Sequence, residues 1–446
     1  MIRKALLLMV LFSWIGCTKD TMIISSELDS QLELLIREAA EDGTLDYYIL
    51  PDGSDLSQIP QDAEKNALNP AKVQLGKFLF FETGLAQSAV KESGRGTYSC
   101  ASCHIPEAGF KSGAFQGIAD GGEGFGINGD SRVRNTEYEE FELDVQSARP
   151  LTMVNVGFVE NTFWNGQFGS TGVNVGTEDV WAEREATNNN FLGFEGIETQ
   201  NFIGLVDHRI EINKPLLDSL GYTDLFNEAF PEIPENERYT VMTGSLAFSA
   251  YIRTIISDKA PFQSYLKGNT SALSYDEKKG AVLFFGKALC TNCHYQENLG
   301  SLEFHALGVK DMYQRPSFDA HPDDRRNKGR GGFTLDEADD FKFKVPGIYN
   351  VHETPFFFHG SSAESLEEVI EYKNLALTEN DNVSQELISD EFQPLNLTEE
   401  EKNQLVLFIK NGLRDPDLTR YAPQDLPSGN CFPNADLQSI IDIGCN

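Results

Sequence analysis

A short string of residues occurs twice in this sequence, each time in the same setting, and the repeat restricts the folds open to the chain. Cys-x-x-Cys-His begins at Cys100 and again at Cys290. The string Gly-x-x-Leu-Phe-Phe precedes each copy, beginning at Gly76 and at Gly280. An ordered pair of motifs that recurs in one chain indicates an internal duplication. We therefore predict two versions of one folding module.

Local signals predict that a helix leads into each copy. Asn69, with a proline directly after it, is typical of an N-cap and predicts a helix that includes residues 73–81. Ser274 and Glu277 form a capping box ahead of the second helix. Each module is thus expected to be a helix followed by the cysteine string.

The repeated string carries the chemistry. Two cysteines three positions apart lie on one face of a turn, where their sulfurs can bond both vinyl groups of haem, and the following histidine can ligate the iron. A four-cysteine zinc site would leave the paired histidines unexplained, and redox disulfides of the thioredoxin type need a βαβ setting that this sequence lacks. We therefore predict two covalently bound haem c groups, the first on Cys100, Cys103 and His104 and the second on Cys290, Cys293 and His294.

The sixth iron position decides what each haem does. A pure electron carrier fills it with Met or His, whereas catalysis on peroxide or oxygen needs an open iron. After His104 the next histidine is His208, and the one methionine between them, Met153, lies in an apolar run that is typical of core. No obvious residue closes haem 1, so we expect it to be the active site.

The N-terminus predicts export. Arg3 and Lys4 precede an apolar run from Ala5 to Ile15, which is too short to span a bilayer and is typical of a signal peptide. Cys17 follows in the position that it has in bacterial lipoprotein signals. We expect cleavage after residue 16 and a lipid on Cys17, which would hold a periplasmic protein at a bacterial membrane. Plain secretory cleavage is the alternative.

The chain is strongly acidic, with 69 acidic against 36 basic side chains and a formal net charge of -33. Such a charge repels phosphate backbones and excludes nucleic acid as a partner. Its 31 Phe and 14 Tyr residues supply ample packing material, which argues against disorder. The acidity favours docking of a basic electron-carrying cytochrome. The oligomeric state stays open, with a dimer among the alternatives.

These signals predict a mostly α chain with two cytochrome c-like haem domains in tandem and little β structure. Thr398 and Glu401 form a further capping box, and the helix after it should close the second domain. Cys431 and Cys445, left over near the end, are expected to form a disulfide in an exported protein. The predicted parts are a signal peptide (1–16), a polar tether with a short helix at 28–40 (17–66), the haem 1 domain (67–262), the haem 2 domain (263–416) and a tail (417–446).

Further motifs occur in a fixed order in both halves. They are 75–81, 99–104, Asn155-Val156, Phe163-Trp164-Asn165-Gly166 and 247–254 in the first half, and 284–288, Phe343-Lys344-Val345-Pro346, Asn350-Val351, 354–360 and 366–369 in the second. In this order the chain resembles the bacterial dihaem cytochrome c peroxidases and their relative, the methylamine dehydrogenase maturation oxidase MauG. The resemblance covers the region from Asn69 to Leu413.

The resemblance implies roles for residues around haem 1. Trp164 matches a tryptophan that lies between the two haems and relays electrons, whereas a lone tryptophan is otherwise a core residue. The family places a distal acid/base glutamate after a glutamine, and Gln200 and Glu211 fit this arrangement with a one-residue insertion. His208 lies just before Glu211, and either side chain can shift the proton that peroxide cleavage requires. A solvated glutamate beside a capping histidine is the alternative for this pair.

The loop after the first haem motif departs from the family pattern. In the peroxidases a histidine in this loop closes the resting haem, and activation removes it. Here the loop at 113–144 is long, acidic and glycine-rich and contains no histidine. The resemblance therefore implies a permanently open haem 1, as in the MauG branch.

The resemblance also implies less usual features near haem 2. The position of its sixth ligand, Met in peroxidases and Tyr in MauG, is Lys373 here, preceded by Tyr372. Deprotonated lysine and tyrosinate can both ligate iron, so Lys373, Tyr372 and a residue from elsewhere remain alternatives. His359, in the motif at 354–360, is expected at the cofactor. Arg149 occupies a position of the family's calcium site, and a cation there argues against calcium despite the matching Thr354.

Three functions follow. The leading prediction is an enzyme of the cytochrome-c peroxidase type, which reduces hydrogen peroxide to water with electrons from a small cytochrome or similar donor. The alternatives are a MauG-like oxidase that modifies a partner protein or small substrate, and a dihaem electron carrier.

Overall fold

The structure is a computed structural model that describes residues 16–445, with side chains described from Ser26 onward. The predicted signal peptide, apart from Gly16, and the side chain of Cys17 lie outside the described residues. Among the described residues, none of the helices is both long enough and apolar enough to cross a membrane.

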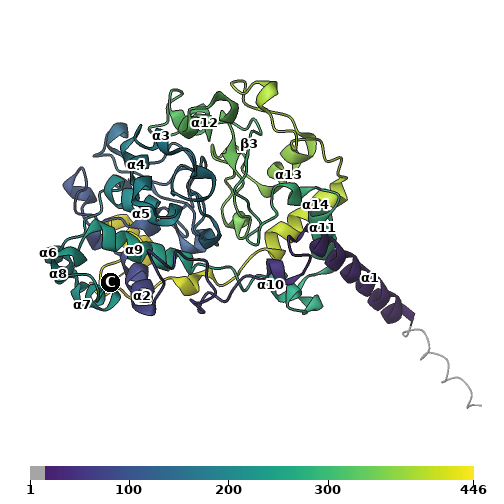
Figure 1. Ribbon diagram of the computed structural model, residues 1–446, viewed down its shortest axis with the longest axis horizontal. Coiled ribbons are helices and arrows are strands. Elements are labelled where there is room, and N and C mark those ends of the chain that lie inside the picture. Colours follow the sequence, from purple (N-terminus) through teal and green to yellow (C-terminus); the bar gives the residue numbers. More distant parts are fainter. Residues whose placement is uncertain (1–15, 446) are drawn as a thin grey trace, which may run out of the picture.

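Two similar groups of helices form the two halves of the molecule, which lie on the left and right of Figure 1. In the first half, α2 (Pro70–Phe81) packs against α9 (Val241–Arg253), and α5 (Gly196–Asp207) packs on α9 as well. In the second half, α11 (Tyr275–Phe285) packs against α14 (Glu399–Leu407). The expected arrangement of two helical modules is confirmed.

The predicted helix starts are also confirmed. The side chain of Asn69 accepts a hydrogen bond from the backbone N–H of Lys72 at the start of α2. The capping boxes that begin at Ser274 and Thr398 are both formed. After Leu407 the chain continues as a π-helical turn, so the last predicted helix is longer than its α-helical part.

The repeated glycine lies where the helices of each half cross. A Cβ atom built on Gly76 would lie 1.8 Å from the carbonyl oxygen of Ala247 in α9. A Cβ atom on Gly280 would lie 2.0 Å from the carbonyl oxygen of Gln404 in α14. Only a residue without a Cβ allows backbones to approach so closely. The duplication in the sequence is therefore also a duplication in the packing.

The remaining elements are short, and the described residues contain only two-residue strands, which confirms the expectation of little β structure. The strands form two antiparallel pairs, β1 (Gly122–Glu123) with β2 (Val133–Arg134) and β3 (Phe304–His305) with β4 (Phe343–Lys344). Besides α1 (Gly16–Ala39), the other α-helices are α3 (Glu178–Trp181), α4 (Glu185–Asn188), α6 (Lys214–Leu220), α7 (Thr223–Ala229), α8 (Glu235–Arg238), α10 (Pro261–Leu266), α12 (Gly331–Thr334), α13 (Leu366–Leu375) and α15 (Leu437–Ile443).

The segment expected to be a tether is packed instead, and this corrects the prediction. Helix α1 (Gly16–Ala39) is longer than expected and lies beside α11 (Figure 1). Leu32 and Ile36 are fully buried. The carboxylate of Asp29 pairs with the Nζ atom of Lys278 at 2.6 Å. Most residues of this segment are polar, and its buried apolar stripe has one residue in every four. This stripe was too narrow to predict that the helix packs against another helix.

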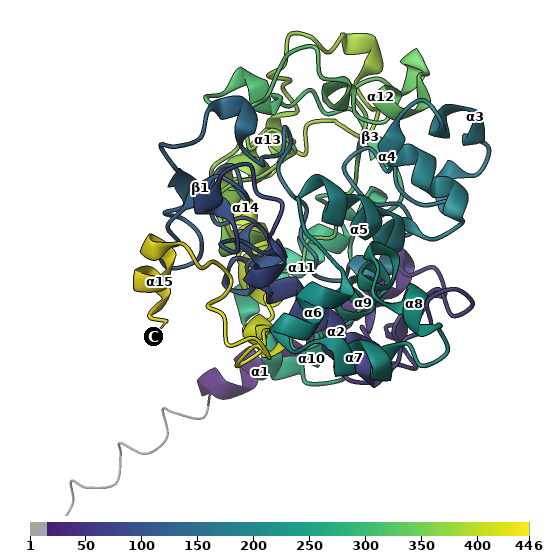
Figure 2. The same ribbon diagram turned by 90° about the vertical axis from the view of Figure 1, so that its left-hand side faces the viewer.

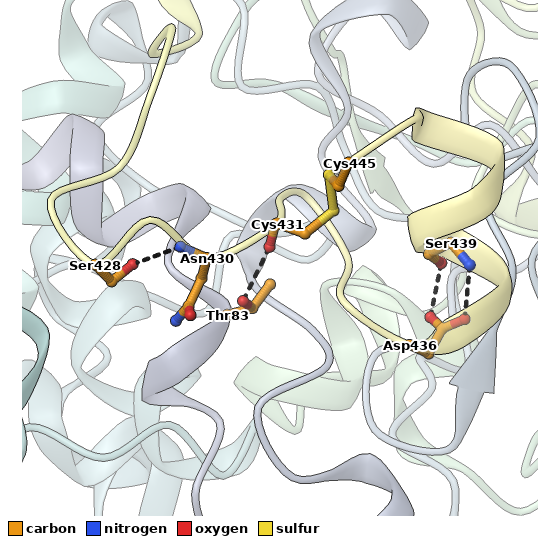
Figure 3. Close-up of a disulfide and its surroundings, with 7 residues drawn as sticks. All are labelled: Thr83, Ser428, Asn430, Cys431, Asp436, Ser439 and Cys445. Carbon is orange, nitrogen blue, oxygen red and sulfur yellow. Dashed lines mark hydrogen bonds between the residues drawn. A yellow bond between two sulfur atoms is a disulfide. The ribbon is translucent and has the colours of Figure 1, made fainter.

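The C-terminal tail returns to the first half of the molecule, where α15 lies beside β1 (Figure 2). A disulfide joins Cys431 and Cys445, whose Cα atoms are 5.8 Å apart. Figure 3 shows that the hydroxyl of Thr83, just after α2, donates a hydrogen bond to the carbonyl of Cys431, at 3.0 Å. Arg132, in the long acidic loop, pairs with Asp436 at 3.1 Å. The tail therefore connects this loop to the end of α2.

Candidate active site

The first Cys-x-x-Cys-His string forms a tight turn that begins with a 3-10 helix over Cys100–Ser102. The Nδ1–H group of His104 donates to the carbonyl of Phe110, at 3.0 Å, which leaves Nε2 free as the atom that can bind a metal. Burial lowers the pKa of His104 to about 4, so the imidazole is neutral at pH 7. Ligation of iron requires this neutral form.

The second string repeats this arrangement. The Nδ1–H group of His294 donates to the carbonyl of Leu299, at 2.8 Å. Burial lowers the pKa of His294 to about 4 as well. Each histidine is thus neutral and is oriented by a backbone carbonyl a few residues downstream.

A cavity of about 400 Å³ opens beside the first string, within the range of small-molecule and cofactor sites. Cys100, Cys103 and His104 line it. All four cysteines of the two strings are unpaired, which argues against redox disulfides. The described residues contain no group of three or more His, Cys, Asp or Glu side chains placed to hold a metal ion. Two free sulfurs and a neutral imidazole on one cavity wall fit a covalently held haem.

Two of the three residues expected near the open face of haem 1 line this cavity, namely Gln200 and His208. Glu211 does not line it. Its backbone N–H bonds to Leu85, and the hydroxyl of Ser88 donates to its carboxylate at 2.5 Å. Arg209 has a positive φ of 59°, which turns the chain between His208 and Glu211. The two candidates therefore point in different directions.

His208 also has a partner that sequence reasoning missed. Its Nδ1–H group donates to the carboxylate of Asp144, at 2.8 Å, and both residues line the cavity. Although burial opposes the charged form of the ring, the nearby carboxylate of Asp144 raises the pKa of His208 above its ordinary value. Asp144 ends the long acidic loop, and nothing in its local sequence signals this contact.

Trp164 lies where the two halves meet. Its indole N–H donates to the carbonyl of Arg149, at 2.7 Å, and its own carbonyl accepts from the backbone N–H of Lys344 at 2.7 Å. The ring packs edge-on against His359, with centroids 6.2 Å apart. His359 in turn stacks on Phe343 at 3.6 Å. The structure thus places His359 beside the tryptophan.

The two candidate ligands of haem 2 differ in their surroundings. The hydroxyl of Tyr372 donates to the carbonyl of Leu307, at 2.6 Å, and is therefore engaged. The amine of Lys373 lies 5.7 Å from the ring centroid of Phe392. Burial lowers the pKa of Lys373, against the opposing effect of the nearby Cys293 and Cys290 sulfurs. A lowered pKa favours the neutral amine that a metal ligand requires.

The position of the family's calcium site holds a buried guanidinium. Arg149 donates to the hydroxyl of Thr354, at 2.8 Å, and to the carbonyl of Ser112 at 2.7 Å. Burial lowers its pKa to about 10, so it stays charged at pH 7. These contacts fix the positive charge of Arg149 beside Thr354, the threonine that matches the family's calcium site.

Fold and site together define a c-type cytochrome with two haem modules, one of which opens onto a cavity. A family model described as di-haem cytochrome c peroxidase matches residues 70–271. The methylamine utilization protein MauG of Methylorubrum extorquens is 26% identical over 354 residues, which cover 79% of this chain and 80% of that protein. The cytochrome-c peroxidase IdrP1 of Denitromonas iodatirespirans is 25% identical over 375 residues, which cover 80% and 84%.

Solved structures agree on the fold. A MauG-like protein associated with microbial copper homeostasis has a TM-score of 0.55 and 23% identity, covering 84% of this chain and 97% of that chain. The diheme peroxidase BthA of Burkholderia thailandensis has a TM-score of 0.52 and 17% identity, covering 82% and 90%. The chain is thus similar in sequence and fold to the dihaem cytochrome c peroxidases and MauG, and it carries two covalently bound haem c groups, as the matching family model implies.

Proposed function

We propose that this protein is a dihaem c-type peroxidase that reduces hydrogen peroxide to water with electrons from a small cytochrome or similar donor. The observation that carries the proposal is the cavity beside His104, lined by the imidazole of His208. Haem held at His104 supplies an iron that binds peroxide and a ring system that exchanges electrons.

The residues of the chain have separate tasks in this proposal. The Nε2 atom of His208 accepts a proton from one oxygen of peroxide and returns it to the other oxygen, which leaves as water. Gln200 orients the substrate from the same wall, and Trp164 conducts electrons between the halves. We further propose export and a lipid anchor on Cys17, which would keep the acidic protein where a basic donor cytochrome can reach it.

A MauG-like oxidase is the second candidate. It is favoured by one observation, the absence of a histidine from the long loop at 113–144 that could close haem 1. Such an enzyme would act on a partner protein or a small substrate.

Two measurements on the purified holoprotein test the proposal. A high-spin signal in the resting ferric spectrum is expected, since an open haem 1 lacks a sixth protein ligand; its absence would favour a plain electron carrier. Steady-state oxidation of reduced cytochrome c by hydrogen peroxide is then expected. An open haem 1 without such turnover would contradict the peroxidase and favour the oxidase.

Replacement of His208 by Gln is expected to lower the rate of reaction with peroxide by about 100-fold, the usual contribution of one acid/base group. Glu211→Gln is the matched comparison and should change the rate by less than about twofold, because Glu211 lies outside the cavity wall. Stopped-flow mixing with peroxide measures both rates. A large loss in Glu211→Gln with none in His208→Gln would reverse the assignment.

The ligand of haem 2 is proposed to be Lys373, because its amine lies near Cys293 and Cys290 while the Tyr372 hydroxyl is engaged. Lys373→Ala is expected to change the haem 2 optical spectrum and shift its reduction potential. Tyr372→Phe should leave both unchanged. If neither variant alters the spectrum, the ligand comes from another part of the chain.

A further inference from the structure

We propose that Asp144 is the positioning residue of the active site, which holds His208 in the tautomer and orientation needed to move the peroxide proton. This inference rests on the proposed function and adds to it a residue from the long acidic loop. The loop that closes the resting haem in the peroxidases would here deliver a carboxylate that supports catalysis.

The geometry of the pair supports this role. Both carboxylate oxygens of Asp144 lie within hydrogen-bond distance of the Nδ1 atom of His208, at 2.9 and 2.8 Å. A bond from Nδ1–H to a carboxylate fixes the neutral tautomer that has its lone pair on Nε2. The side chain of Asp144 is 7% exposed, whereas that of His208 is 37% exposed and lines the cavity. The Nδ1 edge of the ring thus faces the carboxylate, and His208 is the more exposed of these two cavity-lining residues.

The backbone holds Asp144 in place. Its N–H donates to the carbonyl of Asp120, at 3.0 Å, and its carbonyl accepts from the N–H of Ala119 at 2.9 Å. Asp120 is itself buried, and its carboxylate accepts hydrogen bonds from the Tyr138 hydroxyl at 2.6 Å and from Arg209. A carboxylate fixed in this way loses little entropy when it orients the imidazole.

The backbone of His208 also has a fixed partner. The hydroxyl of Tyr98 donates to the carbonyl of His208, at 3.0 Å. Asp144 at Nδ1 and Tyr98 at the carbonyl come from different segments of the chain, so the ring and the backbone of His208 each have a partner. Such double support is what catalytic geometry requires.

Charged groups from several elements surround the imidazole and set its protonation. Burial opposes its charge, Asp144 and Asp207 favour it, and Arg209 opposes it. The raised pKa means that His208 gains its proton at a higher pH than an ordinary histidine. Because only the neutral ring can accept a proton, activity should fall as the pH drops through this raised pKa.

The proton balance of the reaction is simple. Reduction of one hydrogen peroxide to two waters consumes two electrons, which the donor cytochrome supplies, and two protons from solvent. His208 carries one proton from the bound oxygen to the leaving oxygen, so it returns to its neutral form. The Asp144 carboxylate stabilises the transient imidazolium through the Nδ1 hydrogen bond.

The test compares the pH profiles of wild type, Asp144→Asn and Asp207→Asn holoproteins. Two rates are measured, the reaction with peroxide and the binding of cyanide, which enters as HCN and must lose a proton to a distal base. Asp144→Asn is expected to slow both rates about tenfold at their plateau. It should also shift the acid limb of both profiles to lower pH, since the carboxylate that raises the pKa of His208 is gone.

Asp207→Asn is the matched control, because it removes an equal charge next to the same ring without removing a hydrogen bond. It should shift the profiles less than Asp144→Asn. Asp144→Glu, which keeps the charge, is expected to restore the wild-type acid limb. Haem content and the resting spectrum confirm that each variant is folded.

Three results would overturn the inference: coincident profiles for wild type and Asp144→Asn, a larger shift in Asp207→Asn, or an unchanged acid limb in His208→Gln. Cyanide binding keeps the test independent of the proposed function. If wild type binds cyanide with the expected profile but does not turn over peroxide, the peroxidase proposal fails while the Asp144–His208 pair stands.

Discussion

Trp164→Phe is expected to leave both haems attached but to slow electron delivery from the second half to the first by about tenfold or more, which corresponds to about 1.4 kcal/mol in the barrier. The indole lies at the junction of the halves, edge-on to His359 with centroids 6.2 Å apart. A phenyl ring is harder to oxidise than an indole. It also leaves the carbonyl of Arg149 without the donor that now lies 2.7 Å away.

The measurement is a stopped-flow experiment in which the holoprotein with haem 2 reduced is mixed with peroxide and the reoxidation of haem 2 is followed. Trp181→Phe is the matched control, because Trp181 is buried in α3, and its indole N–H donates to the hydroxyl of Thr177 at 2.9 Å, away from the cavity. Its reoxidation rate should equal that of wild type. An equal rate in Trp164→Phe would remove the relay role from the tryptophan.

Much of this architecture could be predicted from local sequence alone. The caps at Asn69 and Ser274 specify where helices begin, because the side chain and the backbone groups that it satisfies lie within one turn. The two Cys-x-x-Cys-His strings specify haem attachment for the same reason. Such signals are contained in a few consecutive residues, so they need no knowledge of the rest of the fold.

The parts that could not be predicted depend on contacts between distant residues. Asp144 and His208 are 64 residues apart, and only the folded loop brings them together. The choice between His208 and Glu211 depends on the left-handed backbone of Arg209, which the sequence does not signal, since arginine seldom adopts it.

The same limit explains the error in the N-terminal segment. The polar surface of α1 resembles that of a tether, and its narrow apolar stripe is stabilised by packing on α11, which lies far away in the sequence. Nothing in the sequence around Lys278 indicates that this residue pairs with Asp29. Tertiary packing decided this element, as it does for most helices in water.

Gly280→Ala and Gly76→Ala are expected to destabilise the protein by about 3 kcal/mol or more each, at or above the upper end of the cost of overpacking. An added Cβ would lie 2.0 Å from the carbonyl oxygen of Gln404 in one case and 1.8 Å from that of Ala247 in the other. Both obstacles are backbone atoms, so no rotation of a side chain can relieve the clash. The facing helices would have to separate, which would also open the core around the haem strings.

Thermal unfolding of the holoproteins, followed by circular dichroism and by haem absorbance, measures the effect. Gly204→Ala is the control, because Gly204 is also helical and an added Cβ there has only the Cδ2 atom of His208 within 4 Å, at 3.8 Å. Alanine is the better helix former by about 1 kcal/mol, so this variant should unfold at or above the wild-type temperature. If Gly76→Ala and Gly280→Ala were as stable as Gly204→Ala, the repeated glycine would not be required by the helix crossings. The repeated occurrence of Gly-x-x-Leu-Phe-Phe would then need an explanation other than helix packing.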